Sequence, residues 1–320
     1  MLKKFFVTAA TTAALACTSL TVTAGYTSLT VFGDSLSDGG NDYIFTGNQF
    51  PPPPYAQRFS NGPTAVERLA SNLGLPLQPS LAGGSNYAFG GAETGLDNFE
   101  RFDIPVPFAG PTATGALAQV QSFAGAFGPN SLVVLWAGPN DLFTALTLGQ
   151  NPANIIAPAM NNLAQSVGLL YGAGAREILM PNMPDIGATP FGLTSGNAAG
   201  LTAFSVGFDF FLNQTINQLE LGLSGLDIIR FDTFSAIHSL IANAGAYGFT
   251  DVTHPCFDEL AQTVCANPNQ YIFWDDVHPT ARTHQLLGDG FTTAVPEPTT
   301  LAMLGLGLAS LGFARRRKLS

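Results

Sequence analysis

The sequence predicts a doubly wound α/β domain in three layers, an α/β/α sandwich with about five parallel strands. Three observations lead to this fold class. Short apolar runs of strand-like composition recur along the chain, segments with helical spacing of apolar residues separate them, and no internal repeat is present. The five predicted strands are residues 28–32, 86–92, 131–136, 176–180 and 226–231.

The composition fits one large globular domain with long loops, since 46% of the 320 residues are hydrophobic, 11% are charged, and glycine and proline number 35 and 22. Charge is unevenly distributed along the chain. Six of the 12 basic residues lie at the two ends, so residues 25–294 hold six basic against 21 acidic residues, a net charge of −15. Such an acidic surface repels phosphate backbones, which argues against a nucleic-acid partner.

The N-terminal 24 residues have the pattern of a secretory signal peptide. Two lysines precede an apolar stretch at residues 5–20, and small residues at 22–24 provide a cleavage site before Gly25. Residues 15–17 (LAC) faintly match a lipoprotein cleavage box, an alternative that the small Ala14 disfavours. We expect the mature protein to begin at Gly25.

The C-terminal tail has three parts: a Pro-Glu-Pro triplet at 296–298, an apolar run at 301–314 and a basic cluster at 315–318. The run is shorter than the roughly 20 residues that a spanning helix needs. A plain C-terminal membrane anchor is the alternative. The tail resembles the PEP-CTERM sorting signal of exported bacterial proteins. This resemblance implies processing by an exosortase and delivery to the cell surface or extracellular matrix of a Gram-negative bacterium, with a transient anchor in the envelope membrane.

The mature chain keeps one pair of cysteines, Cys256 and Cys265, because Cys17 lies within the leader. In an exported protein, an even pair predicts a disulfide. A metal site built from this pair and His254 is the alternative, which an oxidising compartment disfavours.

Around Ser35, an apolar strand stops abruptly at a polar turn flanked by glycine. Residues 28–32 suit a buried strand, and Gly33 allows a sharp turn directly after it. Ser35 then lies at the carboxyl edge of the predicted sheet, where open α/β sheets bind ligands. Residues 41–63 include four consecutive prolines and are expected to form a stiff surface loop, and residues 64–73 have helical spacing.

Two further predicted strands end in groups that can donate hydrogen bonds. Residues 86–92 run into Gly90 and Gly91, whose backbone N–H groups can approach a substrate oxygen closely. The strand at 131–136 ends shortly before Asn140, which offers a side-chain amide. In isolation, each of these residues is also an ordinary turn former.

The remaining elements complete the alternation of strands and helices. Residues 94–111 have no clear period and are expected to form a loop or partial lid over the substrate groove. The expected helices are residues 115–127, 152–171, 201–219 and 234–244. The first of them presents Leu117, Val120 and Gln121 on one side. No second domain is expected.

Asp275 and His278 form an Asp-x-x-His pair late in the chain. A carboxylate three residues before an imidazole can accept a hydrogen bond from Nδ1, which leaves Nε2 free to accept a serine proton. The pattern alone is common and also fits a loop histidine. The adjacent Asp276 is expected to face solvent. Three further histidines are interpreted as lacking a carboxylate placed three residues before them, and hence as structural or exposed: His238, His254 and His284.

Together, four segments resemble the sequence blocks of the GDSL, or SGNH, esterases and lipases: residues 33–41 (GDSLSDGGN), 86–92 (NYAFGGA), 138–141 (GPND) and the pair Asp275 and His278. They occur in the family's order and approximate spacing across the mature chain. Residues 55–63 and 182–190 are similar to the secreted bacterial lipase-like branch. Pro139 is a departure within the third block, and it leaves Asn140 in place.

The resemblance implies a flavodoxin-like fold and a serine hydrolase site. Ser35 would be the nucleophile, His278 the general base and then acid, and Asp275 the residue that orients His278. The oxyanion hole would consist of the N–H of Ser35, the N–H of Gly91 and the side-chain amide of Asn140, with the other glycine of the pair as an alternative donor. The implied chemistry needs no metal and no organic cofactor.

The implied activity is hydrolysis of acyl or phospholipid esters, or other small-molecule esters, through an acyl-serine intermediate. Three alternatives stay open: deacetylation of exported polysaccharide, which a matrix-directed tail favours, acyl transfer, and a non-catalytic surface or matrix protein on the same fold. The expected division of the chain is a signal peptide at 1–24, a hydrolase domain at 25–294 and a sorting tail at 295–320.

Overall fold

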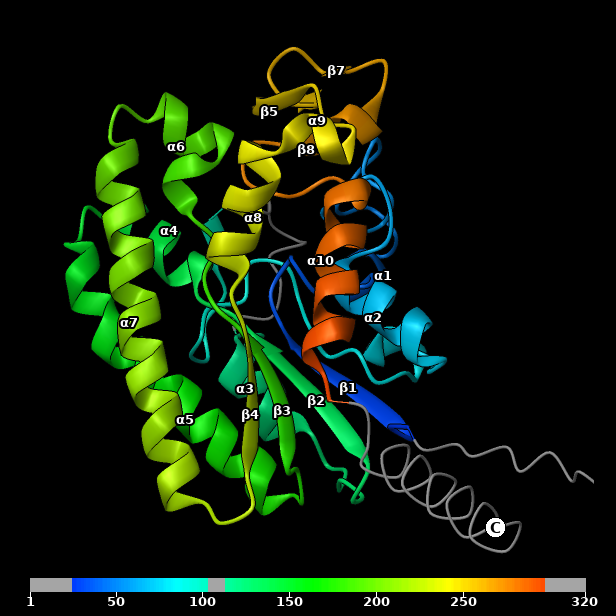
Figure 1. Ribbon diagram of the computed structural model, residues 1–320, viewed down its shortest axis with the longest axis vertical. Helices are drawn as coiled ribbons and strands as arrows, with labels where there is room; N and C mark the ends of the chain where they lie inside the picture. The colour runs from blue at the N-terminus through cyan, green and yellow to red at the C-terminus, as the bar shows by residue number, and fades with distance from the viewer. Residues whose placement is uncertain (1–24, 103–112, 297–320) are drawn as a thin grey trace, which may run out of the picture. The chain divides into compact units, whose positions relative to one another are not determined.

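A parallel sheet forms the centre of the fold (Figure 1). The computed structural model describes residues 25–102 and 113–296. The strands of this sheet are β1 (Ser28–Gly33), β2 (Ser131–Trp136), β3 (Glu177–Pro181) and β4 (Asp227–Phe231). They lie in the order β1-β2-β3-β4, and all three pairings are parallel. Parallel neighbours place the carboxyl ends of the strands at one edge.

The predicted strand at 86–92 is extended but does not form a regular strand. It runs along the free edge of β1, where Val31 N–H donates to Ser85 (3.0 Å) and Tyr87 N–H donates to the carbonyl of Val31 (2.7 Å). The two segments share one parallel bridge, between Val31 and Asn86. If this segment is counted, the strands follow the chain order 2-1-3-4-5 of flavodoxin-like sheets. The predicted fold class is confirmed, with four regular strands.

Helices cover both faces of the sheet, which gives the three layers (Figure 1). One layer contains α3 (Ala116–Ser122), α5 (Ile156–Gly172) and α7 (Ala198–Gly222). The other layer contains α2 (Ala65–Leu73), α8 (Thr233–Ala242) and α10 (Ala281–Ala294). Side chains alternate along each strand, so that Phe32 packs in the first core and Val31 in the second. Both faces are therefore buried, as expected for a parallel sheet.

The helix predicted at 115–127 is shorter than expected, and its buried face differs. α3 ends at Ser122, with Phe123 as its C-cap, and the rings of Phe123 and Phe127 stack on each other (centroids 4.8 Å apart). The N–H of Phe127 donates to the carbonyl of Ala173 instead of continuing the helix. Gln121 is exposed, whereas Gln119 is buried. The prediction was wrong here because a glutamine satisfied by backbone groups can be buried as readily as an apolar residue.

Short elements follow several strands and loops. They are α1 (Asn41–Phe45), η1 (Ser80–Ala82), η2 (Phe99–Phe102), α4 (Pro139–Thr147), η3 (Pro152–Ile155), η4 (Ile186–Ala188), α6 (Pro190–Thr194), α9 (Ala244–Tyr247) and η5 (Pro268–Gln270). α4 begins directly after the carboxyl end of β2, which places the first residues of this helix near Ser35 at the sheet edge.

The segment before α10 contains short strands that the sequence did not predict. β5 (Asp251–Pro255) pairs in parallel with β8 (Tyr271–Phe273), and β6 (Phe257–Asp258) pairs with β7 (Thr263–Val264) as a small antiparallel hairpin. The Cys256–Cys265 disulfide closes this hairpin, as predicted.

The predicted signal peptide and most of the predicted sorting tail lie outside the described residues, as do residues 103–112 of the predicted lid. Within the described part of the chain, no helix is both long and apolar enough to cross a membrane.

Candidate active site

Ser35 lies in the turn that follows β1, at the carboxyl edge of the sheet. The turn depends on Gly33, because a Cβ there would lie 2.3 Å from the carbonyl oxygen of Trp136 on β2. The buried amide of Gln119 holds both polar groups of Gly33: Oε1 accepts from its N–H (2.9 Å), and Nε2 donates to its carbonyl (2.8 Å). Sequence reasoning missed Gln119, since its target is 86 residues away.

Three of the predicted site residues form one hydrogen-bonded path. Nε2 of His278 lies 2.8 Å from Oγ of Ser35, and Nδ1 of the same ring lies 2.7 Å from Oδ2 of Asp275. Ser35 and Asp275 are 8% and 3% exposed. The spacing of three residues lets the carboxylate reach back to Nδ1, and this arrangement leaves Nε2 facing the serine hydroxyl.

The charges of the pair stabilise each other. Burial alone would raise the pKa of Asp275, but the imidazole of His278 and hydrogen bonds to the carboxylate hold that pKa below its ordinary value. Burial alone would lower the pKa of His278, yet Asp275, with the charges of Asp34 and Glu259, outweighs burial and raises it above the ordinary 6.5. The imidazolium is therefore favoured when a proton arrives at this ring.

Four donors hold the carboxylate of Asp275. The backbone N–H groups of Val277 (2.9 Å) and His278 (2.7 Å) donate to Oδ1. Oδ2 is shared between Nδ1 of His278 and the hydroxyl of Tyr55, each at 2.7 Å. Tyr55 comes from the proline-rich loop, and nothing local in the sequence connects it to Asp275.

The three residues predicted to supply the oxyanion donors, Ser35 among them, all border one pocket. The N–H groups of Ser35 and Gly91 have no acceptor among residues 25–102 and 113–296, and both residues border the pocket. Nδ2 of Asn140, which also borders the pocket, donates to the carbonyl of Ala92 (3.1 Å) and keeps its second hydrogen. Gly90 differs, because its N–H donates to Oδ2 of Asp38 (3.2 Å). Of the two glycines, the geometry favours Gly91 as the free donor.

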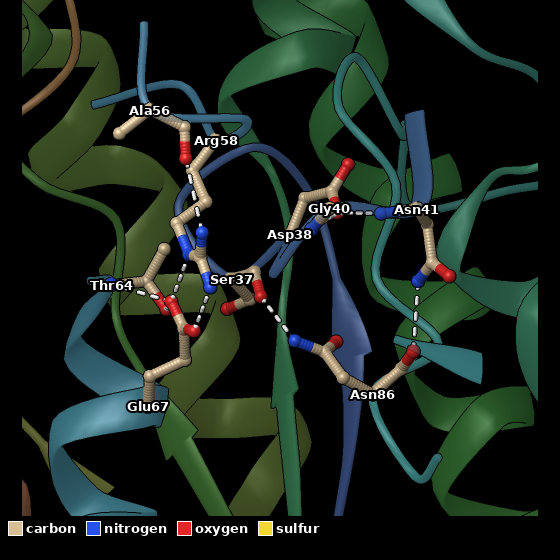
Figure 2. A network of polar contacts seen from close by, with 9 residues as sticks. All are labelled: Ser37, Asp38, Gly40, Asn41, Ala56, Arg58, Thr64, Glu67 and Asn86. Atoms are coloured by element: carbon tan, nitrogen blue, oxygen red, sulfur yellow. Dashed lines mark hydrogen bonds and ion pairs between the residues drawn. The ribbon is translucent and has the colours of Figure 1, made fainter. Parts of the chain in front are cut away.

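A polar network supports the loop that follows Ser35 (Figure 2). Asp38 accepts hydrogen bonds from the N–H groups of Gly40 (2.7 Å) and Asn41 (2.6 Å). The amide of Asn41 donates to the carbonyl of Asn86, and the amide of Asn86 donates back to the carbonyl of Ser37. The loop carrying Ser35 is thus tied to the segment that leads to Gly91.

Figure 2 also shows a second part of this network, centred on Arg58. The Arg58 guanidinium forms a bidentate pair with Glu67, and Glu67 in turn accepts from the backbone N–H of Thr64 (2.9 Å) at the start of α2. This pair fixes the segment between the proline-rich loop and α2.

The pocket has a volume of about 610 Å³ and a largely apolar wall. Its aromatic lining includes Phe50, Phe59, Phe99, Trp136, Phe143 and Phe273. Phe99 belongs to the described part of the predicted lid. Asp276 is exposed, as expected, and lies at the border of the pocket. The cavity can therefore hold an extended apolar group next to Ser35.

The other histidines lie outside this path. Nδ1 of the buried His284 accepts from the N–H of Ala65 (3.2 Å), and burial lowers its pKa to about 3. His238 contacts Asp185 through Nε2 at 2.8 Å. His254 repeats the Asp-x-x-His spacing with Asp251, at 3.1 Å, so the interpretation that His254 lacks a carboxylate three residues before it was wrong.

Comparisons with known proteins give two matches. Residues 29–291 match the family described as GDSL-like Lipase/Acylhydrolase, and residues 294–318 match the PEP-CTERM protein-sorting motif. The sorting motif indicates an exported protein and implies exosortase-mediated processing.

Similar individual proteins include plant and bacterial hydrolases. Two GDSL esterase/lipases of Arabidopsis thaliana are 28% and 27% identical over 312 and 336 residues, covering 78% and 86% of this chain and 82% and 89% of the relatives. Lipase 1 of Photorhabdus luminescens is 24% identical over 374 residues, covering 95% of this chain and 55% of its own length.

Proposed function

The chain belongs to the GDSL-like lipase/acylhydrolase family and is a carboxylic ester hydrolase, and on this basis we propose that it cleaves acyl esters through an acyl-serine intermediate. The observation that carries the proposal is the hydrogen-bonded path from Ser35 through His278 to Asp275, bordering a pocket. Both family resemblances seen in the sequence, to the hydrolases and to the sorting signal, are confirmed.

In the proposed first step, Oγ of Ser35 attacks the ester carbonyl carbon while its proton moves to Nε2 of His278. Asp275 stabilises the imidazolium that forms. The imidazolium then gives its proton to the departing alcohol. In the second step, His278 takes a proton from water, which attacks the acyl-serine, and the acid leaves as the serine regains its proton.

Negative charge develops on the carbonyl oxygen in both steps. We assign its stabilisation to the N–H groups of Ser35 and Gly91, which have no acceptor among the described residues, and to the second hydrogen on Nδ2 of Asn140; all three residues border the pocket. Loss of one such donor typically lowers kcat by about 10²–10³-fold. Preorganised donors of this kind need no rearrangement when the charge appears.

The proposed substrates are esters with an apolar acyl group. The aromatic wall and the volume of about 610 Å³ support this choice, because an acetyl group would leave most of the cavity empty. Deacetylation of an exported polysaccharide is the second candidate, favoured by the sorting motif. A series of p-nitrophenyl esters distinguishes them: kcat/KM that rises with acyl length supports the first, and activity confined to acetate supports the second.

The serine mechanism is tested with a fluorophosphonate probe and a p-nitrophenyl ester, using the wild type and Ser35→Ala. We expect labelling and turnover by the wild type and neither by the variant. Turnover that survives in Ser35→Ala would reject Ser35 as the nucleophile. Absence of both in the folded wild type would favour a non-catalytic surface protein. Ester formation from an added alcohol measures acyl transfer in the same assay.

We further propose that residues 1–24 are removed on export, that 25–294 form the hydrolase domain, and that an exosortase processes the tail at 295–320 at the surface of a Gram-negative cell. Residues Tyr26–Pro296 form one compact unit, which supports these limits. Intact mass measurement of the protein recovered from an exosortase-containing host tests the assignment. A mass that retains both ends would contradict it.

A further inference from the structure

Tyr55 directly follows the four consecutive prolines of the proline-rich loop. Aromatic neighbours fix the position of its ring. The ring centroid is 5.6 Å from that of Phe257, 6.2 Å from that of Trp274 and 6.4 Å from that of Phe59. These neighbours come from three separate segments of the chain. The direction of the phenol hydroxyl is thus set by packing before any hydrogen bond is counted.

The hydroxyl of Tyr55 lies between two carboxylates. It is 2.7 Å from Oδ2 of Asp275, and it also hydrogen-bonds Oε1 of Glu259 in the disulfide-closed hairpin. Burial and the two carboxylates raise the pKa of Tyr55 well above its usual range, so the phenol keeps its proton.

A phenol has one proton and can donate it to one carboxylate at a time. Asp275 is 3% exposed, so water cannot replace a lost donor there, whereas Glu259 is exposed and can be hydrated. Loss of one of the four donors of a buried carboxylate is less favourable than loss of a donor that water can replace. The proton therefore points to Asp275.

This donor differs in origin from the other three that hold Asp275. The other three donors all lie within three residues of the carboxylate: the backbone N–H groups of Val277 and His278, and Nδ1 of His278. Tyr55 lies 220 residues away and shares Oδ2 with the imidazole. It connects the local Asp-x-x-His turn to the proline-rich loop.

We propose that Tyr55 is a positioning residue of the esterase: its hydroxyl fixes the carboxylate of Asp275 and, through that carboxylate, the imidazole of His278. The inference rests on the proposed serine mechanism. Tyr55 also borders the pocket, but the role assigned to it here is the bond to Asp275 rather than contact with the reacting ester.

Removal of the hydroxyl has a consequence that loss of packing would not produce. Without this donor, more of the negative charge of Asp275 is available to His278, so the pKa of His278 should rise. The other charged groups that act on this ring are Asp34 and Glu259, and His284 lies near it. Tyr55→Phe leaves these charges in place, although Glu259 loses its hydrogen bond to the hydroxyl.

The test compares Tyr55→Phe with Tyr171→Phe, a matched control that loses one exposed hydroxyl hydrogen bond, to the carbonyl of Ser224 (2.9 Å). We expect Tyr55→Phe to lower kcat about 10-fold, the scale of one hydrogen bond to a charged group, with KM within about twofold. The acid limb of the pH–rate profile should move to higher pH. Tyr171→Phe should match the wild type.

A double-mutant cycle with Asp275→Asn shows whether Tyr55 acts through Asp275. In that background, Tyr55→Phe should change kcat by less than about twofold. Wild-type kcat and pH profile in Tyr55→Phe, or an effect on KM alone, would overturn the proposal. So would an undiminished effect in the Asp275→Asn background. Fluorophosphonate labelling of the wild type keeps the two questions separate, because its absence would reject the serine mechanism itself.

Discussion

Two Asp-x-x-His sequences lie close together in the chain and share a pattern of local hydrogen bonds, although residues 251–254 lie within β5 and residues 275–278 follow β8. In both, Oδ1 of the aspartate accepts hydrogen bonds from the backbone N–H groups two and three residues later: Thr253 and His254 in one, Val277 and His278 in the other. In both, the carboxylate contacts Nδ1 of the histidine. The two sequences therefore form the same local hydrogen bonds in two different settings.

Burial and distant partners separate the two pairs. The side chains of His254 and Asp251 are 75% and 24% exposed, against 16% and 4% for His278 and Asp275. Nε2 of His278 faces Ser35, and Oδ2 of Asp275 accepts from Tyr55. The shared hydrogen bonds orient an imidazole in both pairs, and a reactive site also requires the groups that the fold brings to it.

Substitution of each histidine is the strongest test of this comparison. His278→Ala should lower kcat/KM by about 10⁴-fold or more, because the proton acceptor is lost, whereas His254→Ala should stay within about twofold. The measurement is turnover of one p-nitrophenyl ester by the two variants. A comparable loss in both would mean that the exposed pair also takes part in the reaction.

Substitution of the two aspartates should show the same contrast, with a smaller loss of activity in the buried pair. Asp275→Asn should reduce kcat by about 10³–10⁴-fold, since an amide cannot stabilise the imidazolium and favours the wrong tautomer. Asp251→Asn serves as the matched variant and should leave kcat within about twofold. Near wild-type turnover by Asp275→Asn would show that His278 does not need its carboxylate.

Substitution of Asn140 tests the contribution of a proposed oxyanion donor, a group that the exposed pair of Asp251 and His254 lacks. Asn140→Ala should lower kcat about 10²-fold with a small change in KM, because the amide acts on charge that develops in the transition state. Asn151→Ala is the control, since its side chain caps η3 by accepting from the N–H of Ala153. A change confined to KM would assign Asn140 to ground-state binding.

The pH dependence of activity should report the buried pair. The imidazole of His278 must be neutral to accept the serine proton, so kcat/KM should fall as pH falls through its pKa. Since Asp275 raises that pKa, the midpoint should lie above the ordinary value of 6.5, and it should be the same in His254→Ala. An acid midpoint below 6.5 would contradict the assignment.

The disulfide-closed hairpin lies between the two Asp-x-x-His pairs in the chain. Its disulfide should affect the stability of the protein more than its catalytic activity. Reduction of Cys256–Cys265 should lower the free energy of unfolding by about 2–3 kcal/mol in the chain-entropy account of a short loop. Urea unfolding with and without reductant measures the effect. Cys256→Ser with Cys265→Ser should lose the response to reductant, and a response that persists would assign the effect to something other than this bond.

Sequence reasoning could predict what local patterns determine. The apolar strands, the turn after β1 and the Asp-x-x-His spacing depend on neighbouring residues, and the structure places Ser35, His278 and Asp275 in contact. The fold class follows from the same alternation of strands and helices. Such features depend on propensity and periodicity, which a single sequence contains.

The parts that the sequence could not predict depend on long-range packing. The side chain of Gln119 reaches Gly33 from 86 residues away, and Tyr55 reaches Asp275 from 220 residues away. His254 shows the converse, since its spacing matches that of His278 but its surroundings are exposed. Burial and distant partners arise only when the chain has folded.

Mapping the adduct of a fluorophosphonate by peptide mass spectrometry tests the central claim most directly. The probe should modify Ser35 and no other serine, and the adduct should be lost or greatly slowed in His278→Ala while His254→Ala is labelled like the wild type. An enzyme that hydrolyses esters but carries the adduct on a different residue, or reacts equally well without His278, would contradict the account.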